Sequence, residues 1–316
     1  MSAPSYGDVK RAKDRIAGHT RPVALAPAGP GAFDGTEVWL ACEFMQHTGS
    51  FKARGAANFT AAHLESGTMP EAGLVIASGG NAGLACAWAA AQHGIPAAVF
   101  LPETAPAVKV DGLRALGADV RQVGSEYAEA LDASRQYAAT TGALQSHAYD
   151  HPLIAAGAGT LLTEIRAGLP EVDTVVVAVG GGGLFAGVTA AAEYHGVRVV
   201  AVEPERCRAL NAALGAGRPV DMAVDSVAAD SLGARRASEG ALRWAQRAGV
   251  TSVLVSDQAI VTARQALWDD RRLAVEHGAA TAVAALTSGA YVPADGERVC
   301  IVLCGANTDP SDLVRL

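Results

Sequence analysis

The sequence predicts an α/β protein whose two domains each contain a mainly parallel sheet flanked by helices. The main observation is that short β-branched runs alternate with Ala-rich helical patterns from residue 73 onward. Such alternation requires crossover connections between parallel strands, and the helices then cover both faces of each sheet. Most of the expected helices begin near a small or capping residue and end at glycine. At 316 residues, the chain is long enough for one large domain or for two that share a cleft.

The expected elements follow one another in a regular order after a helix that begins near Lys52. The expected strands lie at residues 74–78, 97–102, 119–123, 143–147, 174–179, 197–203, 250–257 and 298–304. The expected helices lie at residues 81–94, 106–118, 125–142, 183–196, 207–217, 258–278 and 279–291. The linker at 148–153 indicates a crossing between domains. We therefore assign residues 1–50 and 151–316 to the larger domain and residues 51–150 to the smaller one.

Composition excludes several classes of function. The formal net charge is −7 and there is no basic tract, so we do not expect nucleic-acid binding. The apolar runs are too short and too interrupted for a membrane span, and the N-terminus has no apolar signal core, so we expect a soluble cytoplasmic protein. Five cysteines, an odd number in a long chain, make a disulfide framework improbable.

Three glycine-rich segments follow expected strands. They are SGGNAG after strand 74–78, GGGGL after strand 174–179 and CGAN after strand 298–304. In open α/β sheets ligands bind beyond the carboxyl ends of the strands, so these loops predict one shared site. The run GGGGL also begins a helix, and glycine backbone N–H groups at a helix N-terminus bind phosphate well. The sequence therefore predicts a phosphate-binding loop at residues 180–184.

The glycine pattern alone permits two kinds of cofactor. Gly181, Gly183 and Ala186 fit the G-x-G-x-x-G/A dinucleotide fingerprint, and Glu203 ends the next strand where a ribose-binding acid would fall. This alternative is an NAD-dependent oxidoreductase. Lys52 favours a cofactor that binds covalently to an amine, because a lysine sheltered in a small-residue turn at a helix start has a lowered pKa and forms Schiff bases. A phosphate loop with such a lysine implies pyridoxal 5′-phosphate (PLP).

The segments SFKARGA, SGGNAG, PETAPAVKVDGLRALGA, GGGGL and CGAN occur in this order between about residues 20 and 310. Together they resemble the serine/threonine dehydratase family of PLP-dependent enzymes, which have fold type II and bind PLP in the cleft between two domains. The resemblance implies an ammonia-lyase that removes water from a β-hydroxy amino acid of the L-threonine or L-serine type and yields a 2-oxo acid and ammonia. It also implies a homodimer.

The resemblance further implies a role for each matching residue. Lys52 would be the Schiff-base lysine and catalytic base, Phe51 would pack against the pyridine ring, and Cys304 would lie at the pyridine nitrogen. Asn81 would bind the 3′ oxygen of the cofactor. The phosphate would be held by Gly180, Gly181, Gly182, Gly183 and Leu184, and the substrate carboxylate by Ser78, Gly79, Gly80, Asn81 and Ala82.

Two departures from related enzymes limit the prediction. Serine racemases place a second serine where this chain has Gly79, so racemisation is disfavoured, and an amino-acid racemase stays an alternative. Some relatives bind a divalent cation through a glutamate that matches Glu203 and an aspartate that is replaced here by Ala209, so we predict no metal site. PLP-dependent β-replacement stays an alternative, although the lysine segment of cysteine synthases looks different. Allosteric dehydratases also carry a C-terminal regulatory domain, and we expect no such feedback control here.

Several charged residues could be either structural or functional. His147 and His151 with Asp150 between them could suggest a metal site, but such a loop pair is more often structural. Glu276 and Asp230 match family positions near the active site. We assign neither a catalytic role, because helix capping or a surface charge pair explains them as well.

Overall fold

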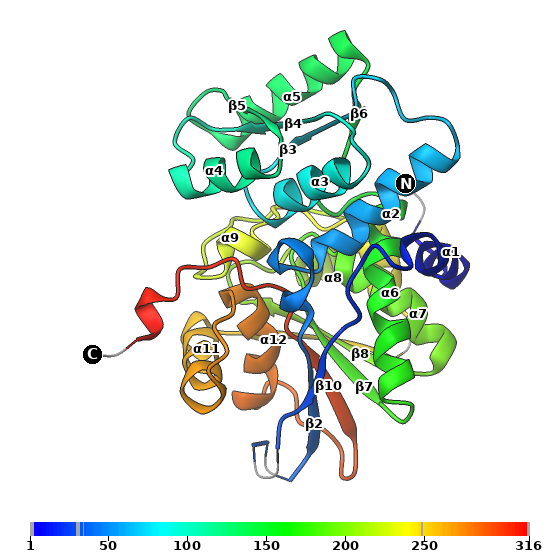
Figure 1. Cartoon of the computed structure of the whole chain (residues 1–316). Coiled ribbons are helices and arrows are strands. Elements are labelled where there is room, and N and C mark those ends of the chain that lie inside the picture. Colours follow the sequence, from blue (N-terminus) through cyan, green and yellow to red (C-terminus); the bar gives the residue numbers. More distant parts are fainter. Residues whose placement is uncertain (1–2, 30–31, 34, 248, 315–316) are drawn as a thin grey trace.

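The computed structural model describes residues 3–29, 32–33, 35–247 and 249–314, and these form two separate, mainly parallel sheets flanked by helices. Figure 1 shows the smaller sheet above the larger one, with α2 and α3 passing between the two layers. The predicted α/β class with two mainly parallel sheets is confirmed. None of the described helices has the length and apolar character needed to cross a bilayer.

The smaller sheet contains four strands in the order β5-β4-β3-β6, and all of its pairs are parallel. Its strands are β3 (Leu74–Ala77), β4 (Ala97–Leu101), β5 (Asp119–Gln122) and β6 (Leu144–Gln145). Both central strands, β3 and β4, are buried along their whole length because helices cover both faces, and their continuous apolar sequences match this position. All four strands lie within residues 51–150. The assignment of that range to a separate domain stays a prediction.

The larger sheet contains six strands in the order β1-β2-β10-β7-β8-β9. Its strands are β1 (Leu25–Pro27), β2 (Glu37–Ala41), β7 (Thr174–Ala178), β8 (Arg198–Pro204), β9 (Val250–Val255) and β10 (Arg298–Val302). Only the pair β1–β2 is antiparallel among the described strands. Strands β1 and β2 precede the region where the sequence pattern alternates, and the sequence did not predict them.

The helices connect these strands and cover the two sheets. They are α1 (Tyr6–Ile16), α2 (Lys52–Glu65), α3 (Asn81–Gln92), α4 (Ala107–Ala115), α5 (Tyr127–Thr141), α6 (Pro152–Gly168), α7 (Gly183–His195), α8 (Ala209–Ala216), α9 (Ala229–Leu232), α10 (Glu239–Ala245), α11 (Asp257–Arg271) and α12 (His277–Thr287). In the larger layer, α6 and α7 lie on one side of the sheet, and α11 and α12 lie on the other (Figure 1).

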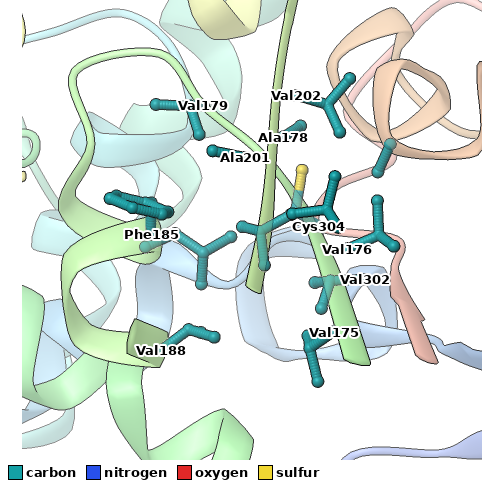
Figure 2. Close-up of a cluster of buried hydrophobic side chains, with 14 of the residues drawn as sticks. Val175, Val176, Ala178, Val179, Phe185, Val188, Ala201, Val202, Val302 and Cys304 are labelled. Carbon is teal, nitrogen blue, oxygen red and sulfur yellow. The ribbon is translucent and has the colours of Figure 1, made fainter. Parts of the chain in front are cut away.

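The main core lies between the larger sheet and its helices. Figure 2 shows valine and alanine side chains of β7 and β8 packed beside Phe185 and Val188 of α7, with Cys304 nearby. Helices α6 and α7 approach so closely that a Cβ atom at Gly187 would lie 1.9 Å from the carbonyl oxygen of Ala155. Small residues at this crossing therefore fix the position of α7, whose N-terminus follows the glycine run.

The predicted helix at 258–278 is wrong at residues 272–276, where the chain is not helical. Helix α11 ends at Arg271, and Arg272 adopts a left-handed conformation with φ of 58°. The following residues form an irregular connection to α12, which begins at His277. The buried side chain of Arg264 donates a hydrogen bond to the carbonyl oxygen of Val275 (2.8 Å) and so holds this connection against α11. The break places Glu276 at the N-cap of α12 instead of inside a helix.

Candidate active site

Lys52 is the first residue of α2, and its amine is partly desolvated. Its Nζ donates a hydrogen bond to the carbonyl oxygen of Ala148 (2.6 Å) and lies 4.8 Å from the centre of the Phe51 ring. Burial lowers the pKa of Lys52 from 10.5 to about 8, while the nearby Cys304 and Glu276 oppose this shift. The desolvation expected from the sequence is therefore present, and a larger fraction of the amine is unprotonated near neutral pH than for an ordinary lysine.

A buried ion cluster supports the turn that carries Lys52. Arg54, which is fully buried in the first turn of α2, donates hydrogen bonds to Glu43 (2.5 and 3.0 Å) and to Glu164 (2.6 and 2.9 Å). It also donates to the hydroxyl of Thr160 (3.2 Å). Both carboxylates keep the guanidinium charged despite its burial, and they raise the pKa of Arg54. The cluster joins the start of α2 to α6 and to the segment after β2.

Cys304 follows β10 and lies next to the lysine turn. The N–H of Phe51 donates to the carbonyl oxygen of Cys304 (2.9 Å), and Ser50 forms an isolated antiparallel bridge with Gly305. The thiol is buried, and this burial raises the pKa of Cys304 to about 12. The side chain is therefore a neutral thiol near the amine of Lys52, as a neutral partner for a pyridine nitrogen requires.

Asn81 is the first residue of α3, in the smaller layer, and contacts residues of the larger layer. Its Nδ2 donates to both carboxylate oxygens of Glu276 (2.8 and 3.1 Å). Its Oδ1 accepts a hydrogen bond from Nδ2 of Asn307 (2.7 Å). Burial raises the pKa of Glu276, while hydrogen bonds from Asn81 and the Asn307 backbone oppose that shift.

Sequence reasoning missed this role of Glu276. It assigned Glu276 no catalytic role and left capping or a surface charge pair as an equally good explanation, whereas the carboxylate is buried and hydrogen-bonded to a predicted cofactor residue. The available signal was weak: Glu276 matched a family position near the active site. Asn307 is the last residue of the segment CGAN, and nothing in the sequence indicated a role for its side chain.

The four glycines at 180–183 join β7 to α7, and each lies against other protein atoms. Gly182 has a φ of 93°, which favours glycine, and a Cβ there would lie 2.3 Å from Cβ of Ala241. A Cβ at Gly181 would lie 2.3 Å from the ring of Tyr149, and one at Gly180 would lie 3.0 Å from the Leu232 backbone. Packing therefore already requires glycine at these positions, so the run alone is weaker evidence for a phosphate than the sequence indicated.

Two helix N-termini near this loop system have no side-chain cap. Helix α7 begins after Gly182 and α3 begins after Gly80, and both N-cap residues are glycines, which have no side chain to cap the helix. The first N–H groups of a helix have no acceptor within the helix, and the helix dipole favours an anion there. A Cβ built at Gly80 would meet no atom within 4 Å, so there is open space beside the start of α3.

The segment 147–150 links the lysine to the glycine run, and the sequence did not predict this. Ala148 accepts the hydrogen bond from Lys52, and the ring of the next residue, Tyr149, covers Gly181. The Tyr149 hydroxyl donates to the carbonyl oxygen of Arg236 (3.2 Å). The connection between the two sheets is therefore part of the site wall.

Other predicted candidates are structural. Glu203 is fully buried in β8 and accepts hydrogen bonds from the N–H groups of Leu210 and Asn211 (2.7 Å each). Burial raises the pKa of Glu203 to about 7. In the loop before α6, Nδ1 of His147 accepts from the backbone of Tyr149, and Nδ1 of His151 caps α6. Among the described residues, no group of three or more His, Cys, Asp or Glu side chains is arranged to hold a metal ion.

Asp230 forms an ion pair across the cleft. Its carboxylate lies 2.6 Å from Nζ of Lys109, which belongs to α4 on the smaller sheet. Both side chains are partly exposed, so this pair is a surface contact between the two layers and not a buried group of the site.

A cavity of about 410 Å³ also opens at the opposite end of the larger sheet, beside Trp39 and Arg298, and no predicted site residue lines it.

The residues that meet here fit PLP. An anionic phosphate matches the uncapped N-terminus of α7, and a substrate carboxylate matches the open, uncapped N-terminus of α3. The partly desolvated amine of Lys52 matches an aldehyde, and the buried neutral thiol of Cys304 matches a pyridine nitrogen. Lys52, Asn81 and Cys304 come from three distant segments and are linked through Glu276 and backbone contacts.

Comparisons with known proteins agree with this fit. Residues 17–305 match the family described as "Pyridoxal-phosphate dependent enzyme". The chain is 37% identical over 293 residues to "Serine dehydratase-like" of Mus musculus, covering 89% of this chain and 88% of the relative. It is 35% identical over 277 residues to "L-threonine ammonia-lyase" of Geobacter sulfurreducens, covering 87% of this chain and 68% of the relative.

Solved structures show the same fold. The crystal structure of a threonine deaminase from T.th. has a TM-score of 0.86 and 31% identity, covering 97% of this chain and 99% of the other. The structure of maize serine racemase has a TM-score of 0.90 and 28% identity, covering 98% of this chain and 96% of the other. Similar proteins thus include both dehydratases and racemases.

Proposed function

Because this chain belongs to the family of pyridoxal-phosphate-dependent enzymes, we propose that it is an ammonia-lyase that removes water from an L-serine- or L-threonine-type β-hydroxy amino acid. The products are a 2-oxo acid and ammonia, which form when the enamine that remains after loss of water hydrolyses. Relatives with dehydratase and ammonia-lyase names support this reaction. The NAD-dependent alternative loses its support, because the matched family uses PLP and because Glu203 is already bonded to backbone N–H groups.

The cofactor, when bound, supplies an electron sink for the pair left on Cα after proton removal. Lys52 supplies the base, because its lowered pKa leaves a useful fraction of free amine near neutral pH. Its contact with the carbonyl of Ala148 holds Nζ at the boundary between the two layers. The neutral Cys304 thiol withholds full positive charge from the pyridine nitrogen, which favours rapid loss of a β-substituent over transamination.

Backbone groups hold the anionic parts. We assign the cofactor phosphate to Gly180–Leu184 at the start of α7, and the substrate carboxylate to residues 78–82 at the start of α3. Both are helix N-termini without side-chain caps, so an anion would supply the missing acceptors. Phe51, whose ring lies beside the lysine amine, would cover one face of the cofactor ring.

The observation that favours elimination over racemisation is the environment of Gly79. A racemase needs a second acid/base group on the side of Cα opposite the lysine. Gly79 offers no acid/base group, and a Cβ built there would lie 2.8 Å from Cδ2 of Leu101, so a serine side chain would also require this leucine to move. Lys52 is then the one base that we assign to Cα.

The test combines a spectrum with a product assay. The purified protein should absorb in the near violet, and borohydride should attach the cofactor permanently to Lys52. A panel of β-hydroxy amino acids is then assayed for 2-oxo acid, and the remaining substrate is analysed on a chiral column. We expect 2-oxo acid from at least one L-substrate, no D-enantiomer, and loss of turnover in Lys52→Ala with an unchanged circular dichroism spectrum. A matched surface variant, Lys10→Ala, should keep full activity.

Other outcomes point elsewhere. A coloured protein that releases no 2-oxo acid but exchanges the β-substituent for an added thiol would identify β-replacement, and accumulation of D-serine would identify a racemase. Turnover retained by Lys52→Ala would refute the assigned base. We also propose a homodimer, as the family resemblance implies, which light scattering on the eluted protein tests directly.

A further inference from the structure

The amide of Asn81 is held between a pure acceptor and a donor. The carboxylate of Glu276 receives hydrogen bonds from Nδ2 at 2.8 and 3.1 Å, and Nδ2 of Asn307 donates to Oδ1 at 2.7 Å. Nδ2 of Asn307 also donates to the carbonyl oxygen of Thr48, which can only accept, so the oxygen end of the Asn81 amide must face Asn307 and its nitrogen end must face Glu276. A 180° rotation of the amide would put two oxygens together at Glu276 and two NH₂ groups together at Asn307.

Both partners are themselves fixed in place. Glu276 is buried, and its Oε1 accepts a second hydrogen bond from the backbone N–H of Asn307 (2.9 Å). The backbone N–H of Glu276 donates to the carbonyl of Gly305 (3.1 Å). Nδ2 of Asn307 also donates to the carbonyl oxygen of Thr48 (2.7 Å), which occupies its second hydrogen. The acceptor and the donor therefore keep their positions independently of Asn81.

One hydrogen of Asn81 remains for another acceptor. An amide nitrogen carries two hydrogens, and the bifurcated contact with Glu276 uses one of them. No hydrogen bond of the described residues uses the other. Glu276 and Asn307 fix the orientation of the Asn81 amide plane, and this fixes the direction of the remaining N–H bond. An oxygen atom of the ligand can therefore accept this hydrogen without a rearrangement of Asn81.

We propose that Glu276 and Asn307 are positioning residues that lock the amide of Asn81 with an N–H, and not its carbonyl oxygen, presented to the 3′ oxygen of the cofactor. This inference rests on the assignment of Asn81 under the proposed function. Both positioning residues belong to loops at the end of the larger sheet, whereas Asn81 begins a helix of the smaller one. The hydrogen bonds that orient Asn81 therefore run between the two layers.

The variants separate hydrogen-bond sense from packing. Glu276→Ala removes the acceptor, whereas Glu276→Gln removes the charge but can still present an oxygen to Asn81. Asn307→Ala removes the donor, whereas Asn307→Asp keeps the size and replaces the donor by an acceptor facing Oδ1. Asn307 is exposed, so neither of its variants should unfold the protein. Glu297→Gln is the matched control, because Glu297 is a buried carboxylate with a backbone N–H partner at the opposite end of β10.

The readouts are the dissociation constant of PLP and the pH midpoint of its absorbance change. Each holoenzyme is purified, its cofactor is removed, and PLP is titrated back while the visible absorbance is followed. We expect Glu276→Ala and Asn307→Asp to weaken PLP binding about tenfold or more and to shift the pH midpoint, since a lost hydrogen bond to a charged group has roughly this effect. The PLP dissociation constants of Glu276→Gln and Asn307→Ala should lie between those of the first two variants and that of the wild type. The dissociation constant of Glu297→Gln should equal that of the wild type.

A purely structural role predicts another pattern. If Asn307→Asp binds PLP as tightly as Asn307→Ala, with the same pH midpoint as the wild type, the proposal is overturned. The same holds if Glu276→Ala lowers the melting temperature but leaves PLP affinity and absorbance within twofold of the control. These measurements require only that the protein binds PLP. If the wild type binds PLP but dehydrates no amino acid, the dehydratase proposal is refuted, and the test of Glu276 and Asn307 can still be interpreted.

Discussion

Replacing Lys52 by methionine should stabilise the cofactor-free protein near neutral pH. The unfolded chain holds this lysine at a pKa near 10.5, whereas burial lowers the value to about 8 in the folded protein. The difference corresponds to about 3.4 kcal/mol, at about 1.36 kcal/mol per pH unit, that opposes folding wherever both states carry the proton. Losing the hydrogen bond to the Ala148 carbonyl costs about 1 kcal/mol in return. We therefore expect Lys52→Met to be about 2 kcal/mol more stable at pH 7.

The pH dependence gives the sharper test. Between the two pKa values the unfolded state binds more protons than the folded state, so the stability of the wild type rises as pH rises from about 8 to 10.5. The variant lacks this contribution, and its advantage should shrink by about 2.5 kcal/mol between pH 7 and pH 10. Titrations with urea, followed by circular dichroism at both pH values, measure the two free energies of unfolding.

Groups that do not interact with residue 52 cancel in the difference, and the thiol of Cys304, which does interact with it, has a pKa of about 12 and so titrates above this pH range. An advantage that does not change with pH would refute the reasoning, because it would mean that the amine is not desolvated in the folded state. A variant that is less stable than the wild type at pH 7 would contradict it as well. A confirmed result would indicate that the folded state bears a free-energy cost for holding a reactive amine in this cleft.

Three further outcomes follow from the packing and charges. Arg54→Met should lower the free energy of unfolding by about 3–5 kcal/mol, because it leaves a buried carboxylate without its partner, whereas Arg114→Met at an exposed pair should change it by less than about 0.5 kcal/mol. Gly187→Ala places a methyl group 1.9 Å from a carbonyl oxygen of α6 and should cost about 3 kcal/mol or prevent folding, whereas Gly215→Ala in open space on α8 should be neutral or stabilising, as urea titrations would reveal. Lys109→Ala removes an ion pair between the two layers and should raise KM roughly two- to fivefold with little change in kcat. The difference in KM should vanish in high salt. A large loss of kcat would contradict the interpretation of this pair as a surface contact.

The alternating pattern was sufficient to predict two parallel sheets, because strand and helix periods are local properties of the chain. Continuous apolar runs such as 174–178 become fully buried central strands. Loops between such strands and the following helices must lie at the carboxyl ends, so the glycine-rich segments after β7 and β10 had to share one edge of the larger sheet. The segment after β3 belongs to the smaller sheet and meets them only through the packing of the two sheets. The same reasoning failed for the helix that ends at Arg271, since the pattern continues beyond it while the contact of Arg264 with Val275 holds the chain extended.

The amino-acid sequence by itself determined the layered architecture, the lysine at a helix start and the glycine loops, because each depends on residues within one short segment. Only the tertiary structure decided that Glu276 faces Asn81 across 195 residues, and that Ala148 faces Lys52 across 96. A buried carboxylate and a surface one look alike in a sequence. The hydrogen-bond partner of a polar group depends on which loops the packing of the two sheets brings together. A local sequence pattern carries no information about such long-range contacts.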